Sequence, residues 1–431
     1  MSTTPSTSFV NRGIGHEEAS DLHTRYHEVR QATVKLCEPL SPEDCVVQSM
    51  PNCSPAKWHL AHTSWFFETF VLERAFPDYV RFNPQFRVLF NSYYQSVGEQ
   101  YSRPMRGLLS RPTLDEVLKY RKHVDRFMIS VLEDGGRCAA ASSVIELGLH
   151  HEQQHQELIL TDIKHMLSFN PLRPAYSDVV GPAGKAPPLN WNEHEGGVKW
   201  IGQGDEDSFA FDNEEPRHRV FIEPFELASR PVTNAEYIAF MEAGGYEHPD
   251  LWLSDGWYAV NDQHWRAPLY WESRDGAWFS FTLSGLRELR PEEPVCHLSF
   301  YEADAFARWA GARLPTEAEW ESATGGVPIE GNFVERGVLH PAPGADSGDG
   351  LIQMFGDVWE WTQSPYTPYP GFNPAEGALG EYNGKFMCNQ IVLRGGSCAT
   401  PQSHIRATYR NFFPPDARWQ FSGIRLARNA K

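Results

Sequence analysis

Residues 57–68 read K-W-H-L-A-H-T-S-W-F-F-E, and residues 144–158 read V-I-E-L-G-L-H-H-E-Q-Q-H-Q-E-L. In both stretches apolar residues recur at intervals of three and four, which predicts two helices that each bury one face. His151 and His155 are four residues apart and share a helical stripe with Val144, Leu147 and Leu158. We therefore expect both imidazoles to point into the interior of a helical bundle.

The first stretch supplies a third inward imidazole. His62 lies on one helical stripe with Trp58 and Trp65, at spacings of four and three. Three imidazoles from two facing helices make a metal site with open coordination positions, as a catalytic metal needs. We therefore predict that His62, His151 and His155 bind a metal. The neighbouring His59 and His150 point off these stripes, so we expect surface groups or groups that orient the ligands.

One alternative uses the same residues. His151-Glu152-Gln153-Gln154-His155 matches H-E-x-x-H, in which two histidines bind zinc and the glutamate is the general base of a metallopeptidase. The extended form of that motif requires glycine and histidine where this chain has Leu158 and Thr161. A zinc hydrolase is therefore kept only as a remote alternative.

The chain divides into a helical part and a part with mixed structure. Apolar periodicity predicts helices over about 20–39, 54–76, 112–133 and 142–167, the minimum for an antiparallel bundle. The irregular stretch over about 77–111 is long enough to suggest a functional loop. We predict the following division: a flexible arm at 1–18, the bundle at 19–172, a Pro/Gly-rich linker at 173–197, and an α+β domain at 198–431, with helices at 233–243 and 299–310 and a helical turn at 316–323.

Composition narrows the class of protein. A net charge of -18 argues against a nucleic-acid partner, because a polyanion would be repelled. No run approaches the ~20 apolar residues of a membrane span, and the N-terminus does not have the pattern of a secretory signal. The seven cysteines show no C-x-x-C pair, so we expect mostly buried free thiols in the cytoplasm, with a disulfide of Cys398 left open.

The two histidine stretches together resemble the ergothioneine-biosynthesis sulfoxide synthases, whose N-terminal part is a DinB-like four-helix bundle. The second half resembles the domain of formylglycine-generating enzymes, a C-type-lectin-like fold. That resemblance rests on F-E-L-A-S-R-P-V-T-N-A-E-Y (225–237), the segment 294–321 from P-V-C-H to E-A-E-W-E, G-D-V-W-E-W-T (356–362), L-R-G-G-S (393–397) and F-S-G-I-R-L-A-R (421–428). The expected fold is thus multidomain, with an α bundle followed by an α+β domain.

The resemblance implies a mononuclear non-haem Fe(II) enzyme. Such enzymes use O2 to couple a thiol to C2 of the imidazole of hercynine and oxidise the sulfur to a sulfoxide. The thiol is cysteine or gamma-glutamylcysteine, and the sequence does not choose between them. The iron ligands carry over onto His62, His151 and His155. No protein partner is predicted.

Further residues are candidates for the chemistry and for substrate binding. A phenol near the metal can supply a proton that favours C–S bond formation over simple thiol oxidation, and the long loop offers Tyr93 and Tyr94. For substrate carboxylates we expect Gln154, Arg103 and Arg106, because arginine forks suit carboxylates. Some relatives hold the trimethylammonium group with an N-W-D-like segment, which is replaced here by Asn411-Phe412-Phe413. With Trp419, these residues are the expected walls of the hercynine pocket, where aromatic faces hold the cation.

Two further alternatives stay open. A 5-histidylcysteine sulfoxide synthase of the ovothiol pathway shares the scaffold, although such proteins commonly carry an added methyltransferase domain that this chain does not show. A metal-stabilised bundle fused to a lectin-like binding module would not be an enzyme. Three inward histidines without a fourth protein ligand argue against such a closed structural site.

Overall fold

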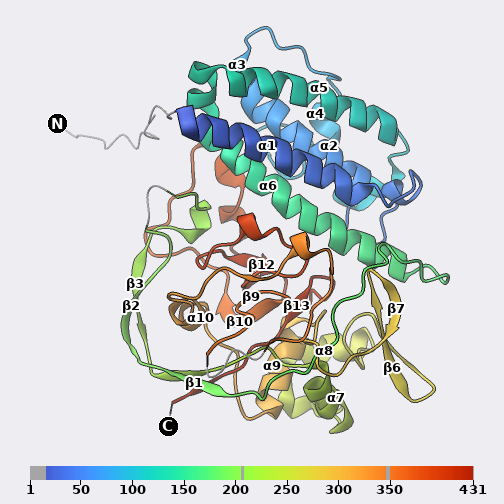
Figure 1. Cartoon of the computed structure of the whole chain (residues 1–431), viewed down its shortest axis with the longest axis vertical. Helices are drawn as coiled ribbons and strands as arrows, with labels where there is room; N and C mark the ends of the chain where they lie inside the picture. The colour runs from blue at the N-terminus through green and yellow to red at the C-terminus, as the bar shows by residue number, and fades with distance from the viewer. Residues whose placement is uncertain (1–15, 205–207, 346–349, 431) are drawn as a thin grey trace. The chain divides into compact units, whose positions relative to one another are not determined.

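The computed structural model describes residues 16–204, 208–345 and 350–430 (Figure 1). The chain forms two compact units, and the division in the sequence falls between Ile159 and Leu160. The first is helical and the second contains the sheets, which confirms the predicted fold class. The predicted N-terminal arm lies outside the described residues except for 16–18, which begin the first helix. Among the described residues, no helix has the length and apolar character that crossing a bilayer requires.

Four helices lie side by side in the N-terminal unit (Figure 1): α1 (His16–Cys37), α2 (Ala56–Phe67), α5 (Leu114–Glu133) and α6 (Gly135–Ser168), of which the residues up to Ile159 belong to this unit. A capping box starts α5, in which Thr113 accepts from the backbone of Glu116 and the Glu116 carboxylate accepts from that of Thr113. Pro55 is the N-cap of α2 and makes no side-chain cap hydrogen bond. Beyond α2 the chain continues through a π-helical turn (Glu68–Leu72) and α3 (Glu73–Ala75). The four predicted helices are thus confirmed.

The long loop after α3 is ordered against α2. It contains α4 (Phe86–Leu89) and a 3-10 turn (Arg103–Leu108). The indole N–H groups of Trp58 and Trp65 donate to the carbonyl oxygens of Leu89 and Arg87, at 3.2 and 3.0 Å. These bonds position the loop over the helix that carries His62.

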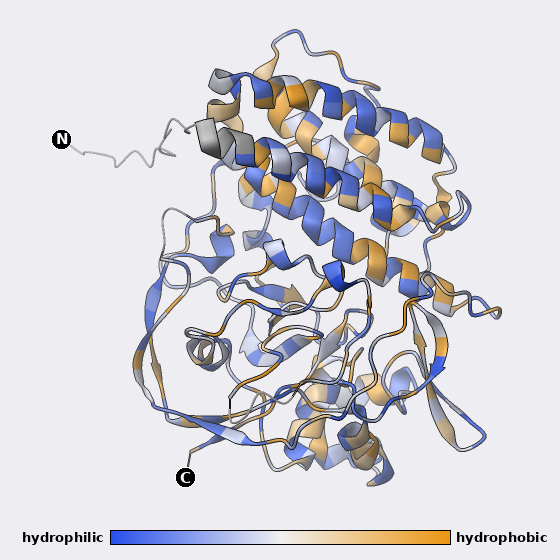
Figure 2. Ribbon diagram, in the orientation of Figure 1, coloured by the Kyte–Doolittle hydropathy of each residue, from blue (hydrophilic) through white to orange (hydrophobic). Residues whose placement is uncertain are grey.

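The centre of α6 is hydrophilic and nevertheless buried. Figure 2 shows a hydrophilic stretch in the middle of this helix, with more hydrophobic residues toward both ends. The stretch includes His151, Glu152 and His155, all of them buried. Burying polar groups costs free energy unless they are paired, so such a stretch indicates a structural or functional demand on these side chains.

The C-terminal unit is built from short strands in several small sheets. The largest has the order β12-β11-β10-β13, made of Asn411–Phe413, Ile391–Arg394, Trp359–Pro365 and Ser422–Gly423. A second has the order β1-β4-β14 (Trp191–His194, Phe225–Ala228, Ala427–Asn429), and a third β5-β6-β7 (Trp271–Arg274, Ala277–Thr282, Gly285–Glu288). Two further pairs of strands are β2 with β3 (Gly197–Ile201, His218–Ile222) and β8 with β9 (Gly331–Asn332, Phe355–Gly356).

Three of the helices in this unit begin at capping boxes that the sequence encodes. Thr233, Ser299 and Thr316 each precede a glutamate by three residues, at the starts of α7 (Asn234–Glu242), α9 (Phe300–Trp309) and α10 (Glu317–Ala323). In the core, the carboxylate of Glu360 accepts from Arg425 at 2.8 Å and from the indole of Trp320 at 2.6 Å.

Two details differ from the sequence prediction. Helix α8 (Ser254–Asp262) was not expected; its N-cap is Leu253, which makes no side-chain cap hydrogen bond, so the usual start signal is missing. Within the predicted linker at 173–197, residues Trp191–His194 form strand β1, which pairs with β4. All seven cysteines are free, and all but Cys388 are buried, so the expected buried thiols are confirmed and Cys398 forms no disulfide.

Candidate metal centre

The three predicted ligands lie together inside the bundle. His62 comes from α2, and His151 and His155 come from successive turns of α6. One ligand atom from each lies within 4.8 Å of the others, and the side chains are 0%, 2% and 8% exposed in that order. The Nε2 atoms of His62 and His151 are 3.2 Å apart. Two nitrogens about 2.1 Å from one ion and at a right angle lie about 3.0 Å apart, so this spacing suits a shared metal.

Hydrogen bonds orient two of the rings, and one of these bonds sets the proton position on His62. Nδ1 of His62 is 2.6 Å from the carbonyl oxygen of Phe90, and a carbonyl only accepts, so Nδ1 donates. The lone pair of His62 is therefore on Nε2. Nδ1 of His155 is 2.7 Å from Nδ1 of His59, which leaves the Nε2 of His155 for a metal. Such partners commonly orient histidine ligands and fix their tautomer.

Aromatic rings enclose His62. Trp58 stacks on its imidazole with the centroids 4.6 Å apart and the planes at 14°, and Trp65 stacks at 5.5 Å and 18°. The guanidinium carbon of Arg106 lies 3.4 Å from the centroid of the Trp58 ring. The ring of Phe66 packs 4.8 Å from that of His151. Aromatic rings of Trp58, Trp65 and Phe66 thus pack against His62 and His151.

The electrostatics keep the three imidazoles neutral. Burial is the main cause that lowers the pKa of each, to about 3 for His151 and well below the usual range for His62 and His155. Each neighbouring imidazole lowers the pKa of His155 further. A neutral imidazole has a lone pair to donate, so these rings are ready to bind a metal near neutral pH.

The glutamate between the ligands is fully engaged elsewhere. Arg30 donates to Oε2 of Glu152 and Arg121 donates to Oε1, each at 2.8 Å. Burial by itself would raise the pKa of Glu152, but the two guanidinium groups hold it down at about 2. A carboxylate that is ionised and bound on both oxygens is poorly placed to act as a general base on a metal-bound water. This geometry argues against the zinc-hydrolase alternative.

Comparisons with known proteins agree with this architecture. Residues 25–159 match the DinB superfamily, and residues 192–341 and 341–430 match the sulfatase-modifying factor enzyme 1-like domain. The chain is 30% identical over 450 residues to the hercynine oxygenase of Mycolicibacterium thermoresistibile, covering 96% of each chain. It is 31% identical over 427 residues to the hercynine oxygenase of Mycolicibacterium smegmatis, covering 92% of this chain and 96% of that one.

The chain belongs to the hercynine oxygenase family. It is therefore an enzyme of an oxygenase family, with a DinB-type bundle and a sulfatase-modifying-factor-type domain. It is also 27% identical over 234 residues to ergothioneine biosynthesis protein 1 of Schizosaccharomyces pombe, covering 51% of this chain and 28% of that one.

The candidate tyrosines of this hercynine oxygenase relative lie on the long loop. Tyr94 is buried, and its ring packs 5.6 Å from Trp65 and 5.1 Å from Phe70. Tyr93 is half-buried and stacks on Tyr94 with the centroids 4.6 Å apart. Trp65 also stacks on His62, so the ring of Trp65 connects Tyr94 to the histidine cluster, while Tyr93 packs on Tyr94. Their catalytic role stays a prediction.

The predicted carboxylate-binding residues have different environments. Arg106 is buried, donates to Oγ of Ser54 at 2.9 Å, and contributes to lowering the pKa of His62 and His155. Arg103 is exposed and donates to the carbonyl oxygen of Asn52. Gln154 is half-buried on α6. Of the three, Arg106 is the one that the structure brings to the histidine cluster.

The predicted residues of the C-terminal unit lie on or near β12, where Phe412 and Phe413 are consecutive in the strand and make separate aromatic contacts. Phe412 stacks on Tyr366 with the centroids 4.0 Å apart and the planes at 9°, and Phe413 meets Trp419 edge to face at 5.9 Å. Asn411, both phenylalanines and Trp419 are half-buried. The rings of Phe412, Phe413 and Trp419 are thus held in place by neighbouring rings and remain partly exposed to solvent.

Of the two alternatives expected for His59, the structure supports a group that orients a ligand, because His59 is buried and bonded to His155; His150 is buried as well. Other residues of the site were not found from the sequence. Arg30 lies on a buried stripe of α1 with Tyr26 and Thr33, and an arginine on such a stripe is a signal that a buried carboxylate faces it. Nothing in the sequence indicates that the carbonyl oxygen of Phe90 accepts from His62.

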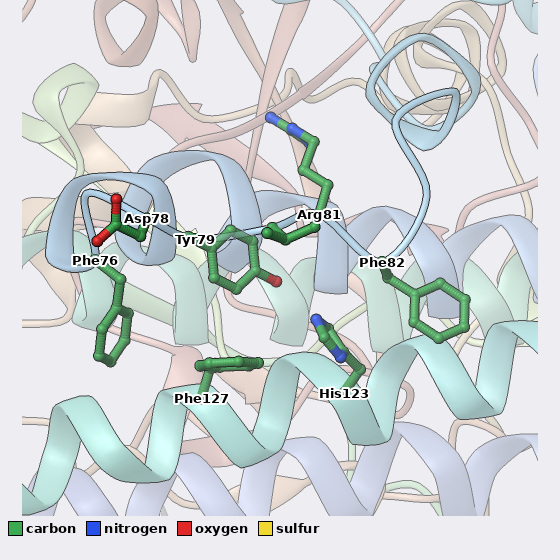
Figure 3. Close-up of a pocket in the computed structure, with 8 residues that line it drawn as sticks. Phe76, Asp78, Tyr79, Arg81, Phe82, His123 and Phe127 are labelled. Atoms are coloured by element: carbon green, nitrogen blue, oxygen red, sulfur yellow. The ribbon is translucent and has the colours of Figure 1, made fainter.

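A separate hollow of about 440 Å³ lies between the loop and α5 in the same unit. Figure 3 shows the rings of Tyr79, His123 and Phe127 gathered in it. Its arginine, Arg81, is paired with Glu68 at 3.2 Å and with Glu73. None of the three clustered histidines lines it, so the chemistry is assigned to the histidine cluster.

Proposed function

We propose that this protein is an Fe(II)-dependent sulfoxide synthase that uses O2 to join a thiol to C2 of the imidazole ring of hercynine, in the cytoplasm. The observation that carries the proposal is the cluster of three buried, neutral imidazoles whose adjacent carboxylate, Glu152, is bound by two arginines. Membership in the hercynine oxygenase family and the similarity to an ergothioneine biosynthesis protein support the substrate. In the overall reaction thiol, hercynine and O2 give the sulfoxide and one water, so the four electrons removed from sulfur and carbon reduce O2 fully.

The donor set fits iron. Imidazole nitrogen suits Fe, Zn, Cu and Ni, and three such ligands leave positions for substrates. His62, His151 and His155 would hold the ion, and bound Fe(II) would supply the redox chemistry with O2 that side chains lack. Because the three ligands are neutral, an anionic thiolate substrate would balance the metal charge, whereas the carboxylate of Glu152 is already neutralised by arginines.

Other residues would bind substrates or move protons. Tyr93 or Tyr94 would donate a proton from the loop that covers α2, favouring C–S bond formation over oxidation of the thiol alone. Arg106, with Gln154 and Arg103, would hold substrate carboxylates. Phe412, Phe413 and Trp419, with Asn411, would receive the trimethylammonium group, because each good cation–π contact contributes roughly 0.5–2 kcal/mol.

The test is oxygen consumption by anaerobically purified protein loaded with Fe(II). We expect consumption only when hercynine and a thiol are both present, and mass spectrometry of the product should show a sulfoxide joined to carbon. Replacing hercynine by histidine tests the ovothiol-type alternative, and competition between cysteine and gamma-glutamylcysteine identifies the donor. Sulfinate as the sole product, or consumption without hercynine, would eliminate the proposal.

A matched pair of variants tests the ligands. His155→Ala should stay folded and lose bound iron and activity. His123→Ala is the control, because this half-buried histidine lies on α5 and lines the hollow of Figure 3. Equal iron content in the His155→Ala variant and the wild type would remove His155 from the ligand set.

A further inference from the structure

Five polar residues connect the four long helices immediately beside the histidines. Glu152 on α6 receives hydrogen bonds from Arg30 of α1 and Arg121 of α5, each at 2.8 Å. The same two arginines reach α2, where Arg121 donates to Oγ1 of Thr63 and Arg30 donates to Oγ of Ser64, again at 2.8 Å. We call these five residues the Glu152 clamp. All five are buried.

The position of the clamp along the chain matters. Glu152 directly follows His151, and Thr63 and Ser64 directly follow His62. Arg121 also donates to the backbone carbonyl of Leu60 at 2.9 Å, so it holds the main chain of α2 as well as a side chain. A single guanidinium therefore joins the turn of α2 that carries one histidine to the turn of α6 that carries another.

We propose that the Glu152 clamp sets the spacing between His62 and His151, and through it the affinity and coordination geometry of the metal centre. This inference rests on the proposed metal site and assigns positioning roles to residues that do not touch the metal. The clamp bonds residues that adjoin His151 on α6 and residues that adjoin His62 on α2. A change in the distance between these bonded residues would therefore move the two imidazoles relative to each other.

Stability alone is a poor explanation of the clamp. Desolvating buried ion pairs costs free energy, and apolar residues of similar volume often serve a core equally well. The cluster uses two arginines where one would neutralise Glu152, and Asp125 at 2.8 Å from Arg30 restores the charge balance. Each arginine adds a planar guanidinium group with donors in fixed directions, which bonds α2 and α6 at defined distances. Partners that orient metal ligands commonly change affinity by about 10- to 100-fold when removed.

The experiment removes the hydroxyl links to α2 and leaves the ion pairs in place. The double variant Thr63→Val/Ser64→Ala in the full chain is compared with the wild type by titration with Co(II), whose absorption spectrum reports its coordination geometry. We expect about 10- to 100-fold weaker Co(II) binding and an altered spectrum. Thr63→Ser, which keeps the hydroxyl, should retain wild-type binding and spectrum.

The matched control is Thr33→Val. Thr33 is buried and its Oγ1 accepts from Gln156 of α6 at 3.0 Å, so the control removes the same chemical group and a link between α1 and α6, but not the link to α2. Melting temperatures of the metal-free variants should fall by similar amounts, while only the clamp variant changes Co(II) binding. Wild-type affinity and spectrum in the clamp variant would overturn the clamp and leave the proposed function standing. Failure of the wild type itself to bind Co(II) would overturn the metal site, and the clamp with it.

Discussion

Gly148 of α6 packs directly against the Phe66 and Phe67 rings of α2, and its replacement by alanine tests the packing of the centre. A Cβ at this position would lie 2.6 Å from Cε1 of Phe67 and 2.9 Å from Cε1 of Phe66. Both rings are fully buried, so they cannot turn away into solvent. Phe66 also packs against the His151 ring at 4.8 Å. The added methyl group should therefore displace a ligand as well as a core ring.

Two opposing effects set the size of the change. Alanine is favoured over glycine inside a helix by about 1 kcal/mol. Overpacking a well-filled core costs about 1–3 kcal/mol. We therefore expect Gly148→Ala to lower the free energy of unfolding of the bundle by about 0–2 kcal/mol net. For a unit of this length that corresponds to a fall in melting temperature of up to roughly 8 °C.

The assay is thermal melting of the metal-free full chain by circular dichroism, together with metal titration. The matched control is Gly135→Ala at the start of the same helix, where a Cβ meets nothing within 4 Å. The control should melt at or above the wild-type temperature and bind metal normally. If Gly148→Ala is as stable as the control and binds metal equally well, the contact between α6 and the Phe66–Phe67 rings does not position His151.

Three more outcomes are expected. Glu152→Gln leaves Arg30 and Arg121 facing a neutral amide, so the free energy of unfolding, measured with denaturant, should fall by about 3–5 kcal/mol. A variant that stays stable and loses only a hydrolytic activity would favour the peptidase alternative instead. Burial lowers the pKa of His151 from 6.5 to about 3, so below pH 6.5 the unfolded chain takes up a proton that the folded chain does not. As the pH falls from 6.5 to about 3, this group should therefore lower the free energy of unfolding of the metal-free protein by at most about 1.4 kcal/mol per pH unit. His151→Asn should reduce the dependence of melting temperature on pH. The same pH dependence in the variant and the wild type would contradict this. Phe412→Ala should raise KM for hercynine about 2- to 30-fold with little change for the thiol, whereas an equal effect on both substrates would remove Phe412 from the trimethylammonium pocket.

Local patterns were enough to predict most of the bundle. Helix periodicity located α5, and the spacing of His151 and His155 placed two imidazoles on one face of α6. These predictions succeed because residues three and four apart on a helix share a face wherever the helix packs. The helical segments predicted from 233, 299 and 316 do start at these positions, where the structure shows capping boxes made by residues only three positions apart.

Partners distant in the sequence were beyond the reach of such patterns. The sequence by itself determined that His62, His151 and His155 face inward, because orientation on a helix depends only on spacing. Only the tertiary structure decided that His59 is buried against His155, that the carbonyl of Phe90 fixes the proton on His62, and that Arg30 and Arg121 occupy Glu152. Each of those contacts joins different helices or a helix and a loop, and its distance depends on how the elements pack, which no periodicity along one segment encodes.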